Sequence, residues 1–462
     1  MEVLLIPYDN DSYIHWFPLG LAYIASALKG GGHRVTIYNQ DKFHYPEKHL
    51  TEYLDRNRFD VVGVGVVAGY YQYRKLLKIS EAVNNSKNRP FYIIGNSGPS
   101  PEPGFFLAKT RADAVVIGEG DETVTALLNA LANREPLDLV KGIAFRKGDN
   151  VTINEKRPLI KDIDNLPFPA YELFPLDYYR LLRMPHVTNR DFVMPIISGR
   201  GCFFKCTFCY RMDEGFRPRS NKSIIEEIIF LQKNFDITYI AFADELLMSS
   251  AERVISLCEA FIRDDINIKW CCNGRLNFAQ PKVLRLMKRA GCIFINYGIE
   301  ALDDEVLKNI KKALTTEVII EGIEATLQVG ISPGCNIIFG NIGDTKETLN
   351  KAVEFLLKYD DGAQMRTIRP VTPYPGSELY YYAINKGLIK DCHDFYENKH
   401  VNSDLLTVNF SELSDDEFNR CLLEANSKLL ANYFRKKLSS IIKDAQRLYL
   451  EKDITFRGFR QT

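Results

Sequence analysis

Residues 202–210, Cys-Phe-Phe-Lys-Cys-Thr-Phe-Cys-Tyr, contain three thiols in the spacing Cys-x3-Cys-x2-Cys. The apolar run Val193–Ser198 precedes them and predicts a buried strand, after which Gly199-Arg200-Gly201 lets the chain turn into a loop. A loop in this position can direct all three sulfurs to one centre. The stretch therefore predicts a thiolate site at the end of a buried strand.

The candidate metal ligands are Cys202, Cys206 and Cys209. Thiolates are soft ligands, and a cluster of them favours zinc or an iron–sulfur cluster. A closed zinc site takes four ligands, but the loop offers no fourth, since the next cysteine is Cys258 and the nearest histidine is His186. Three protein ligands suit a tetra-iron cluster with one open iron, where a substrate or cofactor can bind. A zinc knuckle or three ordinary thiols is the alternative.

Strands and helices alternate after this loop. Counting the strand before it, apolar segments predict parallel strands at residues 193–198, 239–243, 269–273, 294–299, 332–339 and 364–370. Six such steps predict an open, partial (β/α)6 barrel, whereas eight would close a full barrel. Chemistry in barrels of this kind lies at the carboxyl ends of the strands. The sequence places Asp244, Glu245, Arg275 and Glu300 at such ends.

The N-terminal third shows the same alternation. Strands are expected at residues 3–6, 34–38, 60–67, 91–94 and 112–117, with helices between them. This pattern predicts an α/β fold with a Rossmann-like, doubly wound parallel sheet that binds ligands beyond the carboxyl ends of its strands. Glycine-rich turns follow Val67, Ile94 and Ile117, and they would let a bulky ligand approach the backbone closely.

The thiol loop, with Tyr210 after its last cysteine, resembles the signature of the radical SAM superfamily. The resemblance implies that Cys202, Cys206 and Cys209 hold a 4Fe–4S cluster whose open iron chelates S-adenosylmethionine (SAM). Electron transfer then cleaves SAM to a 5′-deoxyadenosyl radical. The residues expected to contact SAM are Arg275 for its carboxylate, Glu300 for its ribose, Asp244 and Glu245 for its amino group, and Asn336 for its adenine.

Residues 17–25, Phe-Pro-Leu-Gly-Leu-Ala-Tyr-Ile-Ala, resemble the opening of the B12-binding domains that are fused to radical SAM barrels. The turns at 95–100 and 118–121 match later landmarks of those domains. The resemblance implies a cobalamin site that includes Tyr70, Gly95, Ser97, Gly118, Glu119 and Gly120. The Asp-x-His-x-x-Gly motif, which supplies a cobalt ligand in methionine-synthase-type domains, is absent from the sequence, and the fused family commonly lacks it. The same turns also suit a nucleotide or a purely structural role.

These patterns divide the chain into four parts. Residues 1–135 are expected to form the cobalamin-binding domain, 136–190 a linker with a hairpin, 191–375 the partial barrel, and 376–462 a C-terminal helical region. Thr372–Tyr380 resembles the segment that ends many barrels of the B12-type family. Ser414 and Glu417 form a capping box at the start of a long helix.

The composition sets limits on partners and surroundings. Fifty-nine basic residues balance 59 acidic ones, so we expect no nucleic-acid partner. The N-terminus lacks the basic and apolar regions of a signal peptide, and no apolar run approaches the length of a membrane span. Seven cysteines lie scattered outside the loop, which is typical of free thiols in a reducing cytoplasm.

The resemblance implies a cobalamin-dependent radical SAM enzyme that methylates an unactivated carbon. In that family the deoxyadenosyl radical abstracts a hydrogen, the substrate radical takes a methyl group from methylcobalamin, and a second SAM restores that methyl group. A radical cyclisation, rearrangement or sulfur insertion without methyl transfer is the alternative. A cobalamin or redox sensor is the alternative outside enzymes. The implied partners are a small-molecule or peptide substrate and an electron donor such as flavodoxin or ferredoxin.

Overall fold

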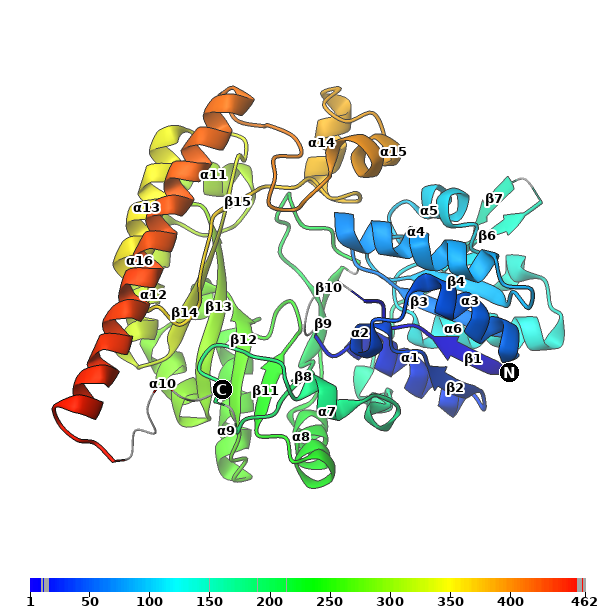
Figure 1. The fold of residues 1–462 in the computed structure, drawn as a ribbon, viewed down its shortest axis with the longest axis horizontal. Coiled ribbons are helices and arrows are strands. Elements are labelled where there is room, and N and C mark those ends of the chain that lie inside the picture. The colour runs from blue at the N-terminus through cyan, green and yellow to red at the C-terminus, as the bar shows by residue number, and fades with distance from the viewer. Residues whose placement is uncertain are drawn as a thin grey trace.

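The computed structural model describes residues 1–9, 11, 16–148, 150–188, 190–212, 214–454 and 459. Two sheets organise the molecule, one in the N-terminal domain and one in the barrel, and they lie side by side (Figure 1). The linker between them contains the short helix α7 (Leu176–Tyr179). The α/β fold class expected from the sequence is confirmed.

The N-terminal sheet has seven strands in the order β2-β1-β3-β4-β5-β6-β7. They are β1 (Glu2–Leu5), β2 (Arg34–Ile37), β3 (Val61–Gly65), β4 (Phe91–Gly95), β5 (Ala114–Val116), β6 (Ile143–Lys147) and β7 (Asn150–Ile153). The first five pair in parallel, as the Rossmann-like prediction requires. The hairpin β6–β7, which the sequence assigns to the linker, instead continues the sheet, because β6 pairs antiparallel with β5. Asp149, in the expected turn of that hairpin, lies outside the described residues.

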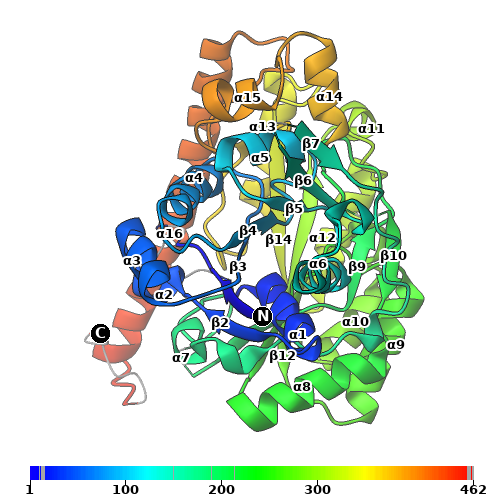
Figure 2. The same cartoon turned by 90° about the vertical axis from the view of Figure 1, so that its right-hand side faces the viewer.

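Helices cover both faces of this sheet, so it is doubly wound (Figure 2). One face packs against α3 (Glu47–Arg56), α4 (Tyr70–Asn84) and α5 (Pro103–Thr110), through a core that includes Leu50, Leu76 and Phe106. The other face packs against α1 (Leu19–Gly30) and α6 (Asp121–Asn133). A further short helix, α2 (Gln40–Phe43), follows β2.

The barrel is a six-stranded sheet in the order β15-β14-β13-β12-β11-β8, with all neighbouring pairs parallel. Its strands are β8 (Val193–Ile196), β11 (Tyr239–Phe242), β12 (Lys269–Gly274), β13 (Cys292–Glu300), β14 (Ser332–Phe339) and β15 (Arg369–Pro370). The partial (β/α)6 barrel is therefore confirmed. The last strand is much shorter than the expected 364–370, because only Arg369 and Pro370 pair with β14.

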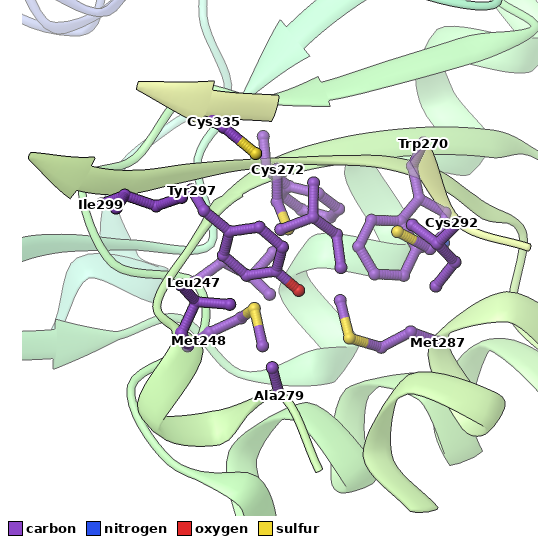
Figure 3. Close-up of a cluster of buried hydrophobic side chains, with 14 of the residues drawn as sticks. Leu247, Met248, Trp270, Cys272, Ala279, Met287, Cys292, Tyr297, Ile299 and Cys335 are labelled. Atoms are coloured by element: carbon purple, nitrogen blue, oxygen red, sulfur yellow. The ribbon is translucent and has the colours of Figure 1, made fainter. Parts of the chain in front are cut away.

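The helices of the barrel lie on its convex face. They are α8 (Asn221–Phe235), α9 (Ala251–Arg263), α10 (Pro281–Arg289), α11 (Asp304–Asn309), α12 (Thr316–Gln328) and α13 (Lys346–Tyr359). Alternate strand residues such as Trp270, Cys272 and Tyr297 point toward these helices and form the main core with Met287 of α10 (Figure 3). The intervening residues therefore face the concave side of the sheet.

The chain after residue 375 divides between the two domains. Helices α14 (Glu378–Asn385) and α15 (Cys392–Asp394) lie near α4 and α5 of the N-terminal domain (Figure 1), where Tyr396 packs 4.6 Å from Tyr73 between ring centroids. The long helix α16 (Asp415–Tyr449) instead packs along α13, and Phe418 stacks 4.9 Å from Phe339 of β14. Among the described residues, no helix is both long and apolar enough to cross a bilayer.

Candidate active site

A cavity of about 410 Å³ lies where the strands of the two sheets end. It begins between the N-terminal sheet and helices α1 and α6, and it extends to the ends of β8 and β11, where Asp244 and Glu245 form part of its wall. The hairpin of β9 (Gly199–Cys202) and β10 (Gly215–Pro218), which carries the first cysteine of the loop, lies beside it. One continuous space thus connects the predicted cofactor domain with the predicted catalytic end of the barrel.

Glycines keep the floor of this cavity open. Gly63, Gly65, Gly95 and Gly120 all line it, among apolar side chains from β1, β3, β4, α1 and α6. A Cβ atom on Gly120 would lie 2.6 Å from Ile24 Cδ1, and one on Gly63 would lie 2.8 Å from Leu5 Cδ2. These positions need glycine for space, and the resulting slot suits a flat, mostly apolar group that inserts between sheet and helices.

The structure brings together four of the six residues predicted to contact cobalamin. Gly95, Gly118, Glu119 and Gly120 line the cavity, and Gly118 has a φ of +76°, which favours glycine. Tyr70 and Ser97 are not among its lining residues. Tyr70 begins α4, which covers the opposite face of the sheet.

Glu119 and Asp121 join the N-terminal domain to the cysteine hairpin. Arg200 Nη1 and Nη2 donate to Asp121 at 2.7 and 3.1 Å, and Nη1 also donates to Glu119 at 3.0 Å. Arg217, on the facing strand, donates to both oxygens of Glu119 at 2.9 Å. Burial opposes charge on Arg200, but hydrogen bonds and charge from the two carboxylates outweigh it and raise its pKa. This cluster fixes the hairpin against the wall of the cavity.

The cysteine loop has two of its three thiols in contact. The side chains of Cys206 and Cys209 hydrogen-bond to each other, which lowers the pKa of Cys206 to about 6 and raises that of Cys209. The charges of Lys312 and Arg275 also lower the pKa of Cys206. Cys202 lies at the end of β9, and burial raises its pKa. In the part of the chain that is described, no three cysteine, histidine or carboxylate side chains lie together as a metal-ligand set.

Arg275 lies against the cysteine loop. Its guanidinium stands over the ring of Phe204 at 3.4 Å from the centroid, and Nη1 lies 3.9 Å from Cys206 Sγ. It also donates to the backbone carbonyl of Lys312. Arg275 is buried, so it is positioned to order the loop. Its predicted contact with the carboxylate of SAM stays a prediction.

Glu300 ends β13 in a left-handed conformation with a φ of +72°. Its Oε1 accepts from Lys312 Nζ at 2.9 Å, and both side chains are nearly buried. A Cβ atom on Gly298 would clash with Glu300 Oε1, which explains the glycine two residues earlier. The carboxylate is therefore held at the strand end, with one oxygen paired to a cation.

Asp244 and Glu245 follow β11 and differ in environment. Asp244 is buried and accepts from the backbone nitrogen of Ser198 at 2.9 Å and from its hydroxyl at 2.6 Å. Burial raises the pKa of Asp244 against these hydrogen bonds. Glu245 is exposed. Asp244 therefore ties β11 to β8, while Glu245 presents its side chain at the cavity.

Asn336 lies on the concave face of the barrel, where Arg366 Nη1 donates to its Oδ1 at 2.7 Å. Sequence reasoning missed Arg366 and the two neighbouring asparagines, Asn273 and Asn296. Each of β12, β13 and β14 contains one asparagine in a largely apolar run, and an isolated amide in such a run is the signal that could have found these residues. Arg366 carries no such signal, since it precedes β15 in an irregular segment.

Two family models match this chain. Residues 196–356 match the radical SAM superfamily, and residues 10–128 match the B12 binding domain. The chain is a radical SAM protein with an N-terminal B12-binding domain. The radical SAM match begins at the last residue of β8 and includes the strands from β11 to β14, and the B12 match includes the glycines of the N-terminal domain that line the cavity.

Relatives of this radical SAM protein differ in their named activities. It is 28% identical over 400 residues to an uncharacterized methyltransferase of Pyrococcus horikoshii, covering 84% of each chain. It is 27% identical to the anaerobic magnesium-protoporphyrin IX monomethyl ester cyclase of Rubrivivax gelatinosus, covering 79% of this chain and 66% of that protein.

A solved structure shares the fold. The radical SAM methyltransferase TsrM from Kitasatospora setae, with cobalamin and a 4Fe–4S cluster bound, superposes with a TM-score of 0.69 at 17% identity, covering 83% of this chain and 78% of that chain.

Proposed function

We propose that this protein is a cobalamin-dependent radical SAM methyltransferase that acts on an unactivated carbon. The observation that carries the proposal is the cavity that runs from the B12-binding sheet to the strand ends beside the cysteine loop. When bound, the cluster and SAM supply a 5′-deoxyadenosyl radical, and cobalamin supplies a methyl group. The chain would hold these groups around one space and keep water out of it.

The donor set fits a cluster with one open iron. Cys202, Cys206 and Cys209 would be its ligands, and two of these sulfurs already lie together. Arg275 and Lys312 place positive charge beside Cys206, which favours the thiolate form that metal ligands require. Glu300, held at the strand end by Lys312, would accept from the ribose hydroxyls of SAM.

The cavity fits part of a cobalamin. Its apolar walls and glycine floor suit a planar group such as the benzimidazole tail. Gly95, Gly118, Glu119 and Gly120 would lie along that tail. Arg200 and Arg217 would keep the wall in place by holding Glu119. Burial of an apolar group in this slot would exclude water from the space next to the barrel.

A radical cyclisation without methyl transfer is the second candidate. The observation that favours it is the 27% identity with the Rubrivivax gelatinosus cyclase over 379 residues. Both candidates use the cysteine loop and SAM, and they differ in whether a methyl group appears in the product.

The same chemistry indicates the cellular compartment and the partners of the protein. All ten cysteines are free thiols, which suits a reducing compartment such as the cytoplasm. A one-electron donor such as flavodoxin or ferredoxin would reduce the cluster. The substrate would be a small molecule or a peptide.

Anaerobic reconstitution with iron, sulfide and hydroxocobalamin tests the proposal. We expect about four irons and one cobalt for each chain, and cleavage of SAM to 5′-deoxyadenosine by the reduced protein. Cys206→Ala should lose iron and SAM cleavage but keep cobalt, whereas Cys421→Ala, remote from the loop, should keep all three. Iron without cobalt would end the methyl-transfer proposal. Cobalt without SAM cleavage would indicate a sensor.

A further inference from the structure

A row of asparagines crosses the concave face of the barrel sheet. Asn296 Nδ2 of β13 donates to Asn273 Oδ1 of β12 at 3.2 Å, and Asn336 lies on β14 beyond them. Their neighbours in sequence, Ile295 and Cys335 among them, pack into the core on the helix side. Asn273 and Asn336 are exposed although they belong to inner strands. The concave face is therefore open to solvent at this level.

Arg366 reaches into this row from the segment before β15. Nη1 donates to Asn336 Oδ1 at 2.7 Å, and Nη2 donates to Gln364 Oε1 at 2.6 Å and to Asn296 Oδ1 at 3.4 Å. Gly334 leaves the room for this approach, because a Cβ atom there would clash with Nη2. Three side-chain amides thus hold the guanidinium over the sheet.

Among the described residues, no carboxylate forms a direct ion pair with Arg366, although the charges of Asp361 and Asp360 act on its guanidinium from farther away. Its three acceptors are neutral amides. The nearby acid Asp360 is paired with Lys436, and Asp361 accepts from the hydroxyl of Ser332. Arg366 is half-buried, and this burial lowers its pKa. A partly desolvated cation with neutral partners gains free energy when an anion binds.

We propose that Arg366 and its asparagine row bind a carboxylate or phosphate group of the substrate. The assignment of this group to a substrate rests on the proposed function. The anion site itself rests on the geometry alone. The methionine carboxylate of SAM is the other source of such a group. Arg366 reaches two levels of the sheet, that of Asn296 and its register partner Gly334, and that of Asn336 and its register partner Gly298. The upper level lies one position below the pair Glu300 and Ile337, so the site adjoins the strand ends where SAM is expected, and the test must separate the two sources.

Saturation-transfer NMR on the reconstituted holoenzyme tests this site. The probes are phenyl phosphate and benzoate, compared with phenol and benzyl alcohol, which lack the charge. We expect at least one anionic probe to bind the native protein, and Arg366→Gln to weaken it about tenfold or more, because charge-assisted hydrogen bonds are lost. Arg366→Lys should retain most of the binding. Arg369→Gln is the matched control, since Arg369 lies in the same segment but pairs with Asp404 at 2.9 Å.

Asn336→Asp keeps Arg366 and places a carboxylate beside it as an internal counter-ion. This variant should therefore also abolish probe binding. It is the variant to use if Arg366→Gln does not fold. No anionic binding to the native protein, or equal binding to all variants, would overturn the site. Displacement of the probe by SAM, with weaker SAM binding to Arg366→Gln, would assign the site to SAM and overturn the substrate assignment. Cobalt content and SAM cleavage are measured separately, so failure of the proposed function would be visible on its own.

Discussion

Arg200 of β9 and Asp121 of α6 form a two-pronged ion pair, with nitrogen–oxygen distances of 2.7 and 3.1 Å, between the cysteine hairpin and the N-terminal domain. Both side chains are largely buried. Arg200 belongs to the Gly-Arg-Gly turn before the first cysteine, and Asp121 follows the glycine-rich turn that lines the cavity. The pair therefore holds the two predicted cofactor sites in a fixed relation.

Replacing Arg200 with methionine should lower the free energy of unfolding of the protein. The change leaves Asp121 as a buried carboxylate without its main partner, which typically costs about 3–5 kcal/mol. We expect a lower urea midpoint in cluster-free protein, measured by tryptophan fluorescence and circular dichroism.

The control for this change is Arg34→Met, because Arg34 pairs with Glu2 at the surface and such pairs contribute about 0–1 kcal/mol. Combining Arg200→Met with Asp121→Asn should cost less than the sum of the single changes. Strict additivity would show that the two side chains do not interact.

Gly65→Val should block the cavity without unfolding the domain. A Cβ atom on Gly65 would lie 3.7 Å from Leu21 Cδ2, an ordinary contact, so the extra methyl groups would occupy the slot. Overpacking of a ligand space costs about 1–3 kcal/mol, so cobalamin should bind roughly tenfold more weakly while SAM cleavage continues. Equilibrium dialysis against hydroxocobalamin measures this. Gly104→Val, on α5 where added atoms meet open space, should bind normally.

Much of the fold followed from local patterns in the sequence. Apolar runs alternating with helices predicted both sheets, and the strand ends predicted where Glu245 and Glu300 lie, because each depends on a few neighbouring residues. The position of Gly95, Gly118 and Gly120 beside a ligand space is predicted for the same reason, and all three line the cavity. Tyr70 was placed with them because it follows a strand end, but the sheet separates α4 from the cavity.

Features that depend on distant packing were not predictable in this way. The sequence predicts a helical region over 376–462 but not what its residues pack against: Tyr396 packs in the core of the N-terminal domain and Phe418 in that of the barrel. Arg366 was missed because its partners come from two other strands. The hairpin β6–β7 joined the sheet through pairing with β5, which no property of the hairpin itself reveals.

Arg275→Lys should loosen the cysteine loop. Lysine keeps the charge but loses the stack on Phe204 and the fork that reaches the Lys312 carbonyl. Losing about 1–2 kcal/mol of the free energy that stabilises the closed loop would raise its open fraction roughly 5- to 30-fold. Iron should therefore pass faster to a chelator, followed by absorbance. Arg263→Lys, an exposed arginine on α9, is the control, and equal rates for the two variants would contradict a role for Arg275 in the loop.

His400 should make the protein acid-labile. It is fully buried, stacks 4.9 Å from Phe395, and shares a 3.1 Å hydrogen bond with the hydroxyl of Thr407. Burial lowers its pKa from 6.5 to about 4. The unfolded chain therefore takes up a proton near pH 6.5 that the folded chain refuses until about pH 4, so stability falls as the pH falls through this window.

Between pH 7 and pH 5 this one group should remove about 2 kcal/mol of stability. His400→Phe keeps the stacking but cannot be protonated, so its urea midpoint should fall less than that of the native protein over the same range. His393→Gln changes an exposed histidine in the same segment and should follow the native curve. Parallel pH dependence of the native protein and His400→Phe would show that His400 is protonated in the folded state at these pH values.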